Sequence, residues 1–157
     1  AVMMSFIYQI RELQNGGEFV VLLFLAAWGN DTLAYCTGML IGKHKMSPIL
    51  SPKKSIEGLV GGIVGAAILG ALYGLYLNTY IRFSFNPVTM FPIVCGLGGA
   101  VSVIGDLAAS AIKRDSGIKD YGTLIPGHGG ILDRFDSIIF IAPVIYYLTV
   151  MISGGAI

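Results

Sequence analysis

The chain has 157 residues, of which 55% are hydrophobic and only 12% are charged, and its mean hydropathy is +0.77. Soluble domains carry about 25% charged residues, so this composition excludes an ordinary soluble globular protein and predicts an integral membrane protein. The formal net charge of +1 gives no reason to expect a polyanionic partner, and we expect no nucleic-acid binding.

Four apolar stretches are candidates for membrane-spanning helices. They cover residues 19–41, 56–77, 88–112 and 137–151. At a helical rise of about 1.5 Å per residue, the first extends about 34 Å, which is enough to cross a bilayer. Residues 1–18 are either the end of an earlier helix or an interfacial segment. We therefore expect an all-α fold, a polytopic transmembrane helical bundle.

Basic residues are distributed unevenly between the loops that connect these stretches. Residues 42–55 and 113–136 each carry four Lys or Arg, whereas the opposite side carries Arg11 and Arg82. Basic loops are retained in the cytoplasm, so both segments are predicted to lie on the cytoplasmic side. A polar cleft between them would open at the cytoplasmic face of the membrane.

Glycines recur at a spacing of four in the second apolar stretch, in the pairs Gly58/Gly62, Gly61/Gly65 and Gly70/Gly74. Small residues at this spacing allow helix backbones to approach closely in lipid. The pattern predicts a tightly packed helix within the bundle. An interface between two copies of the chain, forming a homodimer, is the alternative interpretation.

Two acidic residues, Asp31 and Asp106, lie within apolar stretches. A carboxylate near the membrane centre costs about 2.5–3.5 kcal/mol, so each must face a wet cavity, a metal, a cation or a structural polar network. At about 100° per residue, one face of the third stretch carries Ser102, Asp106, Ser110 and Lys113. This face predicts one wall of a polar cleft that is open to the cytoplasm.

Residues 110–136 form the longest polar interruption of the sequence. They contain four basic residues, four acidic residues and a glycine-rich turn at 126–130. Such a turn exposes backbone N–H groups to an anion, and carboxylates hold hard cations, so this segment can bind a polyphosphate and a metal together. Within the turn, His128 is a candidate general base or metal ligand, and a hydrogen-bonding structural role is the alternative.

Defined residues recur at fixed spacing through this polar segment, namely Ser110, Lys113, Arg114, Lys119, Asp120, Pro126, Gly127, His128, Gly129, Gly130, Asp133, Arg134 and Asp136. The pattern resembles the signature of the phosphatidate cytidylyltransferases, also called CDP-diacylglycerol synthases. Shorter pieces at 28–31, 42–45, 51–55 and 105–107 fit the same family. The resemblance implies one membrane-embedded domain over residues 1–157, as the C-terminal portion of a longer protein in a bacterial inner membrane.

The resemblance also implies an activity and its cofactor. Members of this family make CDP-diacylglycerol and pyrophosphate from CTP and phosphatidate at the lipid bilayer. Asp106 and Asp133 match the family's metal-binding aspartates, which implies Mg²⁺ as the cofactor and a monovalent cation as a candidate second ion. Many members have an acid where this chain has Ala109, so the ion site is expected to carry one charge fewer here.

The other matched residues divide into a catalytic and a substrate-binding set. The expected catalytic residues, besides the two aspartates, are Lys113, Arg114, Lys119, Asp120, Arg134 and Asp136. The expected substrate-binding residues are Asp31, Ser51, Lys53, Lys54, Ser110, Gly127, His128, Gly129 and Gly130. The basic side chains would offset phosphate charge, and the additional acids would orient the basic side chains or water molecules.

Two alternative functions stay open. A related intramembrane transferase that acts on another lipid phosphate or on a polyprenol would have nearly the same polar segment. An ion transporter or channel would line its path with Asp31 and Asp106. Against the channel, the polar residues are concentrated in one loop and do not run continuously through the apolar stretches.

Overall fold

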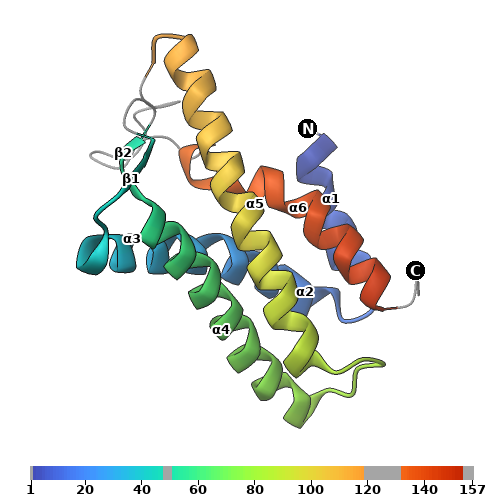
Figure 1. Cartoon of the computed structure of the whole chain (residues 1–157). Helices are drawn as coiled ribbons and strands as arrows, with labels where there is room; N and C mark the ends of the chain where they lie inside the picture. Colours follow the sequence, from blue (N-terminus) through green and yellow to red (C-terminus); the bar gives the residue numbers. More distant parts are fainter. Residues whose placement is uncertain (1, 48–50, 119–131, 154–157) are drawn as a thin grey trace.

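The computed structural model describes residues 2–47, 51–118 and 132–153, without the side chains of 47, 51–53, 132–134 and 136. In chain order, its elements are α1 (Val2–Glu12), α2 (Gly16–Phe24), the π-helix η1 (Leu25–Gly29), α3 (Asn30–Ile41), β1 (Lys45–Ser47), β2 (Ser51–Ser55), α4 (Ile56–Tyr80), α5 (Pro87–Asp115) and α6 (Leu132–Ile152). The predicted all-α helical bundle is confirmed, with one small hairpin added to it (Figure 1).

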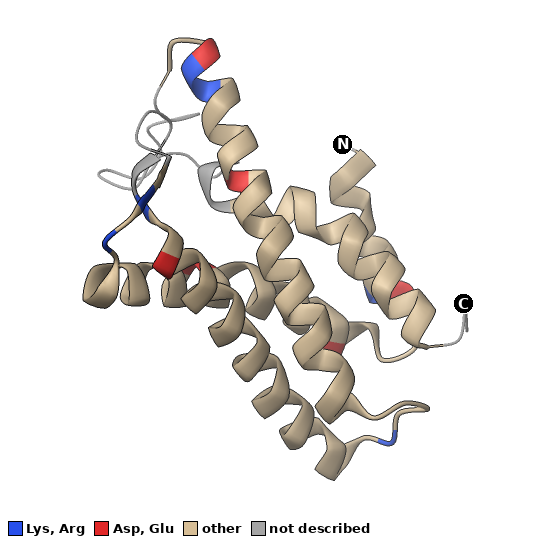
Figure 2. Ribbon diagram, viewed as in Figure 1, with Lys and Arg blue, Asp and Glu red and all other residues tan. Residues whose placement is uncertain are grey.

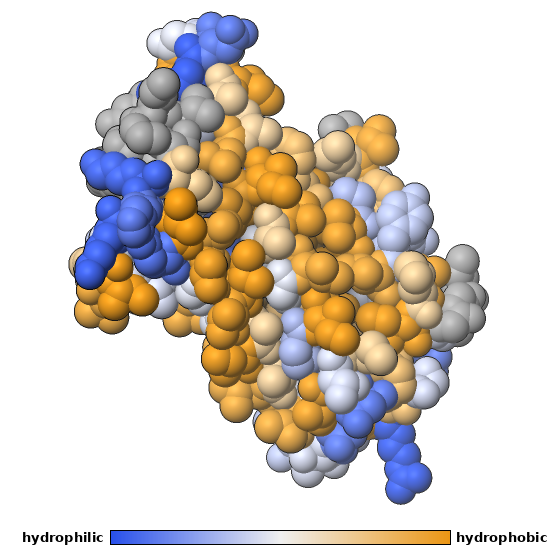
Figure 3. All heavy atoms as spheres, in the orientation of Figure 1, coloured by the Kyte–Doolittle hydropathy of each residue, from blue (hydrophilic) through white to orange (hydrophobic). Residues whose placement is uncertain are grey.

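Three helical segments are long and apolar enough to cross a membrane, namely Gly16–Ile41, Ile56–Tyr80 and Pro87–Asp115. The first is a continuous run of α2, η1 and α3. The fourth predicted span is also helical, but the apolar part of α6, Ser137–Ile152, is shorter than the other three segments. Hydrophobic side chains cover the middle of the visible face, and hydrophilic ones gather at its ends (Figure 3). The chain is therefore a membrane protein.

The first spanning segment begins at Gly16, earlier than predicted. Asn15 adopts a left-handed conformation with a φ of 59°, which turns the chain between α1 and α2. The turn is tight, since a Cβ added at Gly16 would lie 2.3 Å from the carbonyl oxygen of Ile10. α1 packs against α6, and the ring centroids of Phe6 and Tyr146 are 5.3 Å apart there. Residues 2–15 are thus a packed helix and a turn.

Side-chain caps define where α4 and α5 begin. The Oγ of Ser55 accepts a hydrogen bond from the Gly58 N–H at 3.1 Å. The Oδ1 of Asn86 accepts one from the Val88 N–H at 3.0 Å, and Pro87 occupies the first helical position. Ser and Asn satisfy free N–H groups at helix starts, and proline fits the first turn because it has no N–H to satisfy. Both starts therefore follow from local sequence.

Residues 42–55, which we expected to form a basic loop, contain an antiparallel hairpin. β1 and β2 pair with Lys45 opposite Ser55 and Ser47 opposite Ser51. The expectation of a loop was wrong for the paired residues. The strands form through cross-strand pairing, and the segment lacks the apolar alternation from which strands can be predicted. The hairpin leads directly into α4, and the Ile56 N–H donates to the His44 carbonyl oxygen at 2.9 Å.

The glycines of α4 allow two neighbouring helices to pack closely against it. In its first half, an added Cβ at Gly58 would lie 2.7 Å from the Ala34 carbonyl oxygen of α3. In its second half, an added Cβ at Gly74 would lie 2.6 Å from the Pro87 carbonyl oxygen of α5. The predicted tight packing is therefore confirmed within one chain. The homodimer interface stays a prediction.

Candidate active site

The centre of the site is an ion pair between Lys54 of β2 and Asp106 of α5. Their side chains are 28% and 24% exposed, respectively, so the surrounding protein covers most of each. The two residues are separated by 52 positions, and the hairpin brings them together. Charged residues gather at the end of the bundle that carries the hairpin (Figure 2). Among the partners considered for Asp106, the structure shows a cation, the Lys54 ammonium. Its role as a metal ligand stays a prediction.

The predicted polar face of α5 exists, but much of it is covered by neighbouring elements. Ser102 is fully buried, and its Oγ has no hydrogen-bond partner among the described residues. Asp106 and Ser110 are half-buried. Lys113 is only 9% exposed and has an interaction partner. A lysine this deeply buried is normally paired. The polar residues of this face are therefore covered to different degrees, and none of the four is fully exposed.

α6 crosses α5 directly beside Asp106. A Cβ added at Gly105 would lie 2.8 Å from the Phe140 Cβ, so the two helices are in close contact there. The first turns of α6, which carry Asp133 and Asp136, precede this crossing by one to two helical turns. The side chains of these two aspartates lie outside the described residues, so their meeting with Asp106 stays a prediction.

The other predicted site residues are placed less completely. Arg114 is exposed in the last turn of α5. The negative end of the helix dipole stabilises a cation there. Asp31 is exposed on α3 and has an interaction partner. Ser51 and Lys53 belong to β2, and their side chains are not described. The residues that fall outside the described ranges are Lys119, Asp120, Gly127, His128, Gly129, Gly130 and, for its side chain, Arg134.

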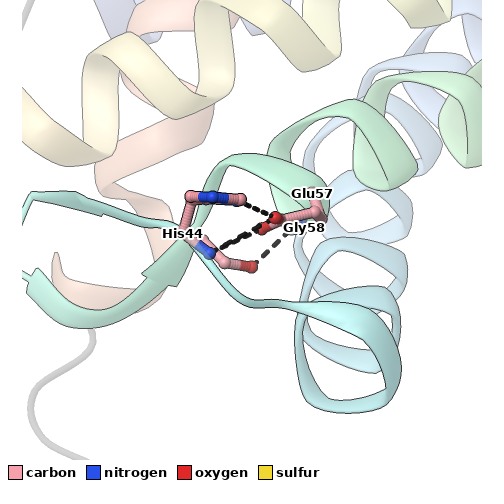
Figure 4. A network of polar contacts seen from close by, with 4 residues as sticks. His44, Glu57 and Gly58 are labelled. Carbon is pink, nitrogen blue, oxygen red and sulfur yellow. Dashed lines mark hydrogen bonds and ion pairs between the residues drawn. The ribbon is translucent and has the colours of Figure 1, made fainter.

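A pair between His44 and Glu57 was not predicted, and it ties the hairpin to the first turn of α4 (Figure 4). The Glu57 carboxylate accepts hydrogen bonds from the His44 backbone N–H at 3.2 Å and from its Nδ1 at 2.6 Å. A carboxylate can only accept, so the Nδ1 carries the hydrogen. The acid beside the Ser55 cap was a visible signal of a helix start, but nothing local marked His44 as its partner.

Asn30 is a second residue that sequence reasoning did not select individually. It directly follows η1, is fully buried, and has no hydrogen-bond partner for its amide among the described residues. A Cβ added at Gly62 would lie 2.8 Å from the Asn30 Oδ1, and one added at Gly99 would lie 3.0 Å from it. Asn30 thus lies where α3, α4 and α5 meet. π-Helical turns are frequent at functional sites, but the sequence carries no reliable signal for one.

Comparison with known proteins identifies the family. The model of the cytidylyltransferase family matches residues 1–152 of the chain. This chain belongs to the cytidylyltransferase family. The family that the sequence motifs resembled is therefore confirmed, and the match covers the bundle as well as the polar segment.

Among curated proteins, this cytidylyltransferase-family chain is similar to several bacterial phosphatidate cytidylyltransferases. It is 37% identical over 148 residues to that of Staphylococcus saprophyticus, covering 94% of this chain and 55% of the relative. It is 39% identical over 145 residues to that of Staphylococcus aureus strain COL, covering 92% and 53%, respectively. The chain thus spans about half the length of the curated relatives it matches.

The described residues of this family member supply only part of the ligand set that a magnesium site needs. Within the described ranges, no group of three His, Cys, Asp or Glu residues could hold a metal ion. Magnesium, however, commonly takes one or two carboxylates together with water and substrate phosphates. Asp106 is a half-buried carboxylate already in contact with a cation, so it suits the role of one such ligand.

Proposed function

We propose that the protein is a membrane-bound cytidylyltransferase that makes CDP-diacylglycerol from CTP and phosphatidate. The observation that supports it most directly is the half-buried Asp106 carboxylate, held against Lys54 in a bundle of the cytidylyltransferase family. The names of the similar staphylococcal proteins supply the substrate class. A phosphatidate oxygen would attack the α-phosphorus of CTP, and the bond to the β-phosphate would break as pyrophosphate leaves.

The two substrates restrict where the reaction takes place. CTP is dissolved in water and phosphatidate is embedded in lipid, so the site must lie at a membrane face. The hairpin and the C-terminal end of α5 lie at the same end of the bundle (Figure 1), and both are basic. The positive-inside rule predicts that this end faces the cytoplasm, where CTP is available. We therefore assign the site to the cytoplasmic face of a bacterial inner membrane.

Phosphate transfer of this kind needs positioning and charge neutralisation more than proton abstraction. The phosphate of phosphatidate is already ionised at neutral pH, so no strong base is required. Lys54 contacts Asp106 on the polar face of α5, and the buried Lys113 belongs to that face. We assign both, with Arg114, Lys119 and Arg134, to the substrate phosphates.

We assign Asp106 and Asp133 to a Mg²⁺ ion, with a monovalent cation as a candidate second ion. When bound, the magnesium ion would neutralise charge on phosphate oxygens. Asp120 and Asp136 would orient basic side chains or water molecules. The close contact of Gly105 with Phe140 supports this assignment, because it holds the α6 backbone beside the turn that carries Asp106.

The test is an Asp106→Asn variant in the intact protein, assayed for labelled CDP-lipid formed from labelled CTP and phosphatidate. We expect at least a 100-fold loss of turnover, the scale seen when a group that stabilises transition-state charge is removed. Asp115→Asn is the matched control, since Asp115 is an exposed aspartate at the end of the same helix. Turnover retained by Asp106→Asn would overturn the assignment of this residue.

The acceptor lipid is tested separately in the wild-type protein. Phosphatidate, a polyprenyl phosphate and other lipid phosphates are supplied in turn with labelled CTP. We expect phosphatidate to be used at least tenfold faster than the others. Preference for another lipid phosphate would support the related transferase instead, and ion flux in liposomes without nucleotide turnover would support the channel.

A further inference from the structure

The contact between Lys54 and Asp106 has a consequence for how one ligand affects the binding of another. Both side chains are about one quarter exposed, so the surrounding protein covers most of each. An unpaired carboxylate in such a place is costly, and a charge partner in direct contact offsets that cost. The Lys54 ammonium contacts the Asp106 Oδ2, one of the two oxygens that a metal ion on Asp106 could use.

The backbone that follows Lys54 is anchored, while its side chain is long. Lys54 immediately precedes Ser55, which caps α4, and the adjacent Ile56 N–H is bonded to His44. The His44–Glu57 pair adds a second tie between the hairpin and the helix. Lysine carries its ammonium on a flexible four-carbon stem. The ammonium can therefore leave Asp106 without any movement of the hairpin backbone.

We propose that Lys54 is a resident counter-ion of Asp106 that makes metal binding conditional on nucleotide. A divalent ion and an ammonium in contact with the same carboxylate repel each other and compete for the same oxygen. Without nucleotide, displacing Lys54 would leave its charge unpaired. When the metal arrives with a triphosphate, the phosphate oxygens provide the new partner for Lys54. Metal and nucleotide then bind cooperatively, and each raises the affinity for the other.

This inference rests on the proposed function, because it takes Asp106 as a metal ligand and a nucleoside triphosphate as the co-ligand. It goes beyond that function by assigning Lys54 a positioning role toward a ligand that binds Asp106. A purely structural ion pair makes a different prediction. Loss of Lys54 would then lower stability and would leave intrinsic metal affinity unchanged.

The experiment measures Mn²⁺ binding to the intact protein in detergent, without nucleotide, from the paramagnetic resonance signal of free Mn²⁺. We expect Lys54→Met to bind Mn²⁺ at least tenfold more tightly than the wild-type protein. Lys54→Arg, which keeps the charge, should bind like the wild type. Lys45→Met is the matched control, since it removes an exposed lysine from the same hairpin. Its affinity should be unchanged, and Asp106→Asn should abolish the tight binding.

A second titration, with CTP present, measures the cooperativity. CTP should tighten Mn²⁺ binding by the wild-type protein more than tenfold and by Lys54→Met much less. A thermal melt of each variant identifies loss of folding. Lys54→Gln is a second variant without the charge, for use if Lys54→Met does not fold. Equal Mn²⁺ affinity in folded Lys54→Met and wild type would overturn the inference even with normal CDP-lipid synthesis. Tighter binding by Lys54→Met without CDP-lipid synthesis by the wild type would instead refute the proposed function.

Discussion

Gly105 of α5 lies directly against Phe140 of α6, and a Cβ added at Gly105 would lie 2.8 Å from the Phe140 Cβ. A Gly105→Ala substitution should therefore force the helices apart at the turn that carries Asp106. We expect a loss of about 1–3 kcal/mol of stability, the usual cost of overpacking, together with reduced CDP-lipid synthesis. Thermal unfolding in detergent and the CTP assay measure the two effects.

The control for this prediction is Gly96→Ala in the same helix. There the nearest atom to an added Cβ is the Ala67 Cβ at 3.7 Å, an ordinary contact distance. Gly96→Ala should leave stability and activity nearly unchanged. Equal behaviour of the two variants would contradict the close contact between α5 and α6.

The His44–Glu57 pair should protect the base of the hairpin from local opening. Glu57→Gln removes the charge that accepts the His44 N–H and Nδ1–H bonds. We expect faster hydrogen exchange at the Ile56 amide, which is bonded to the His44 carbonyl oxygen, and a lower rate of CDP-lipid synthesis. Glu12→Gln, at an exposed glutamate that ends α1, is the control. Unchanged exchange at Ile56 in Glu57→Gln would argue against the pair.

The two helix caps offer a comparison between opposite ends of the bundle. Ser55→Ala and Asn86→Ala each remove an N-cap hydrogen bond and should each cost about 1 kcal/mol of stability. Only Ser55 adjoins Lys54, so only Ser55→Ala should also lower CDP-lipid synthesis. Loss of activity in both variants, in proportion to stability, would show that the effect is not local to the site.

Membrane orientation is testable with single cysteines at exposed positions on the two sides. Cys36 is exposed and Cys95 is buried, so a Cys36→Ser background removes the accessible thiol. In that background, Arg82→Cys should react with an impermeant maleimide added to intact bacterial cells after outer-membrane permeabilisation. Lys45→Cys should react only once the inner membrane is opened. The reverse pattern would place the proposed site on the wrong side for cytoplasmic CTP.

Much of the helical architecture could be predicted from local sequence. The starts of α4 and α5 follow from Ser55, Asn86 and Pro87, because caps act on the nearest turn. The glycine spacing of α4 correctly indicated close packing. The hairpin and η1 could not be predicted in this way, because cross-strand pairing and an extra residue in a helical turn depend on what packs against them.

The sequence by itself determined that this chain lies in a membrane, that its four apolar stretches are helical, and which family it belongs to. Those properties depend on hydrophobic length, local capping and motif spacing, all of which are present along the chain. Only the tertiary structure decided that Lys54 is the partner of Asp106 and that Gly105 meets Phe140. Such contacts arise because folding brings distant residues together, and the choice of partner depends on the packing of the whole bundle.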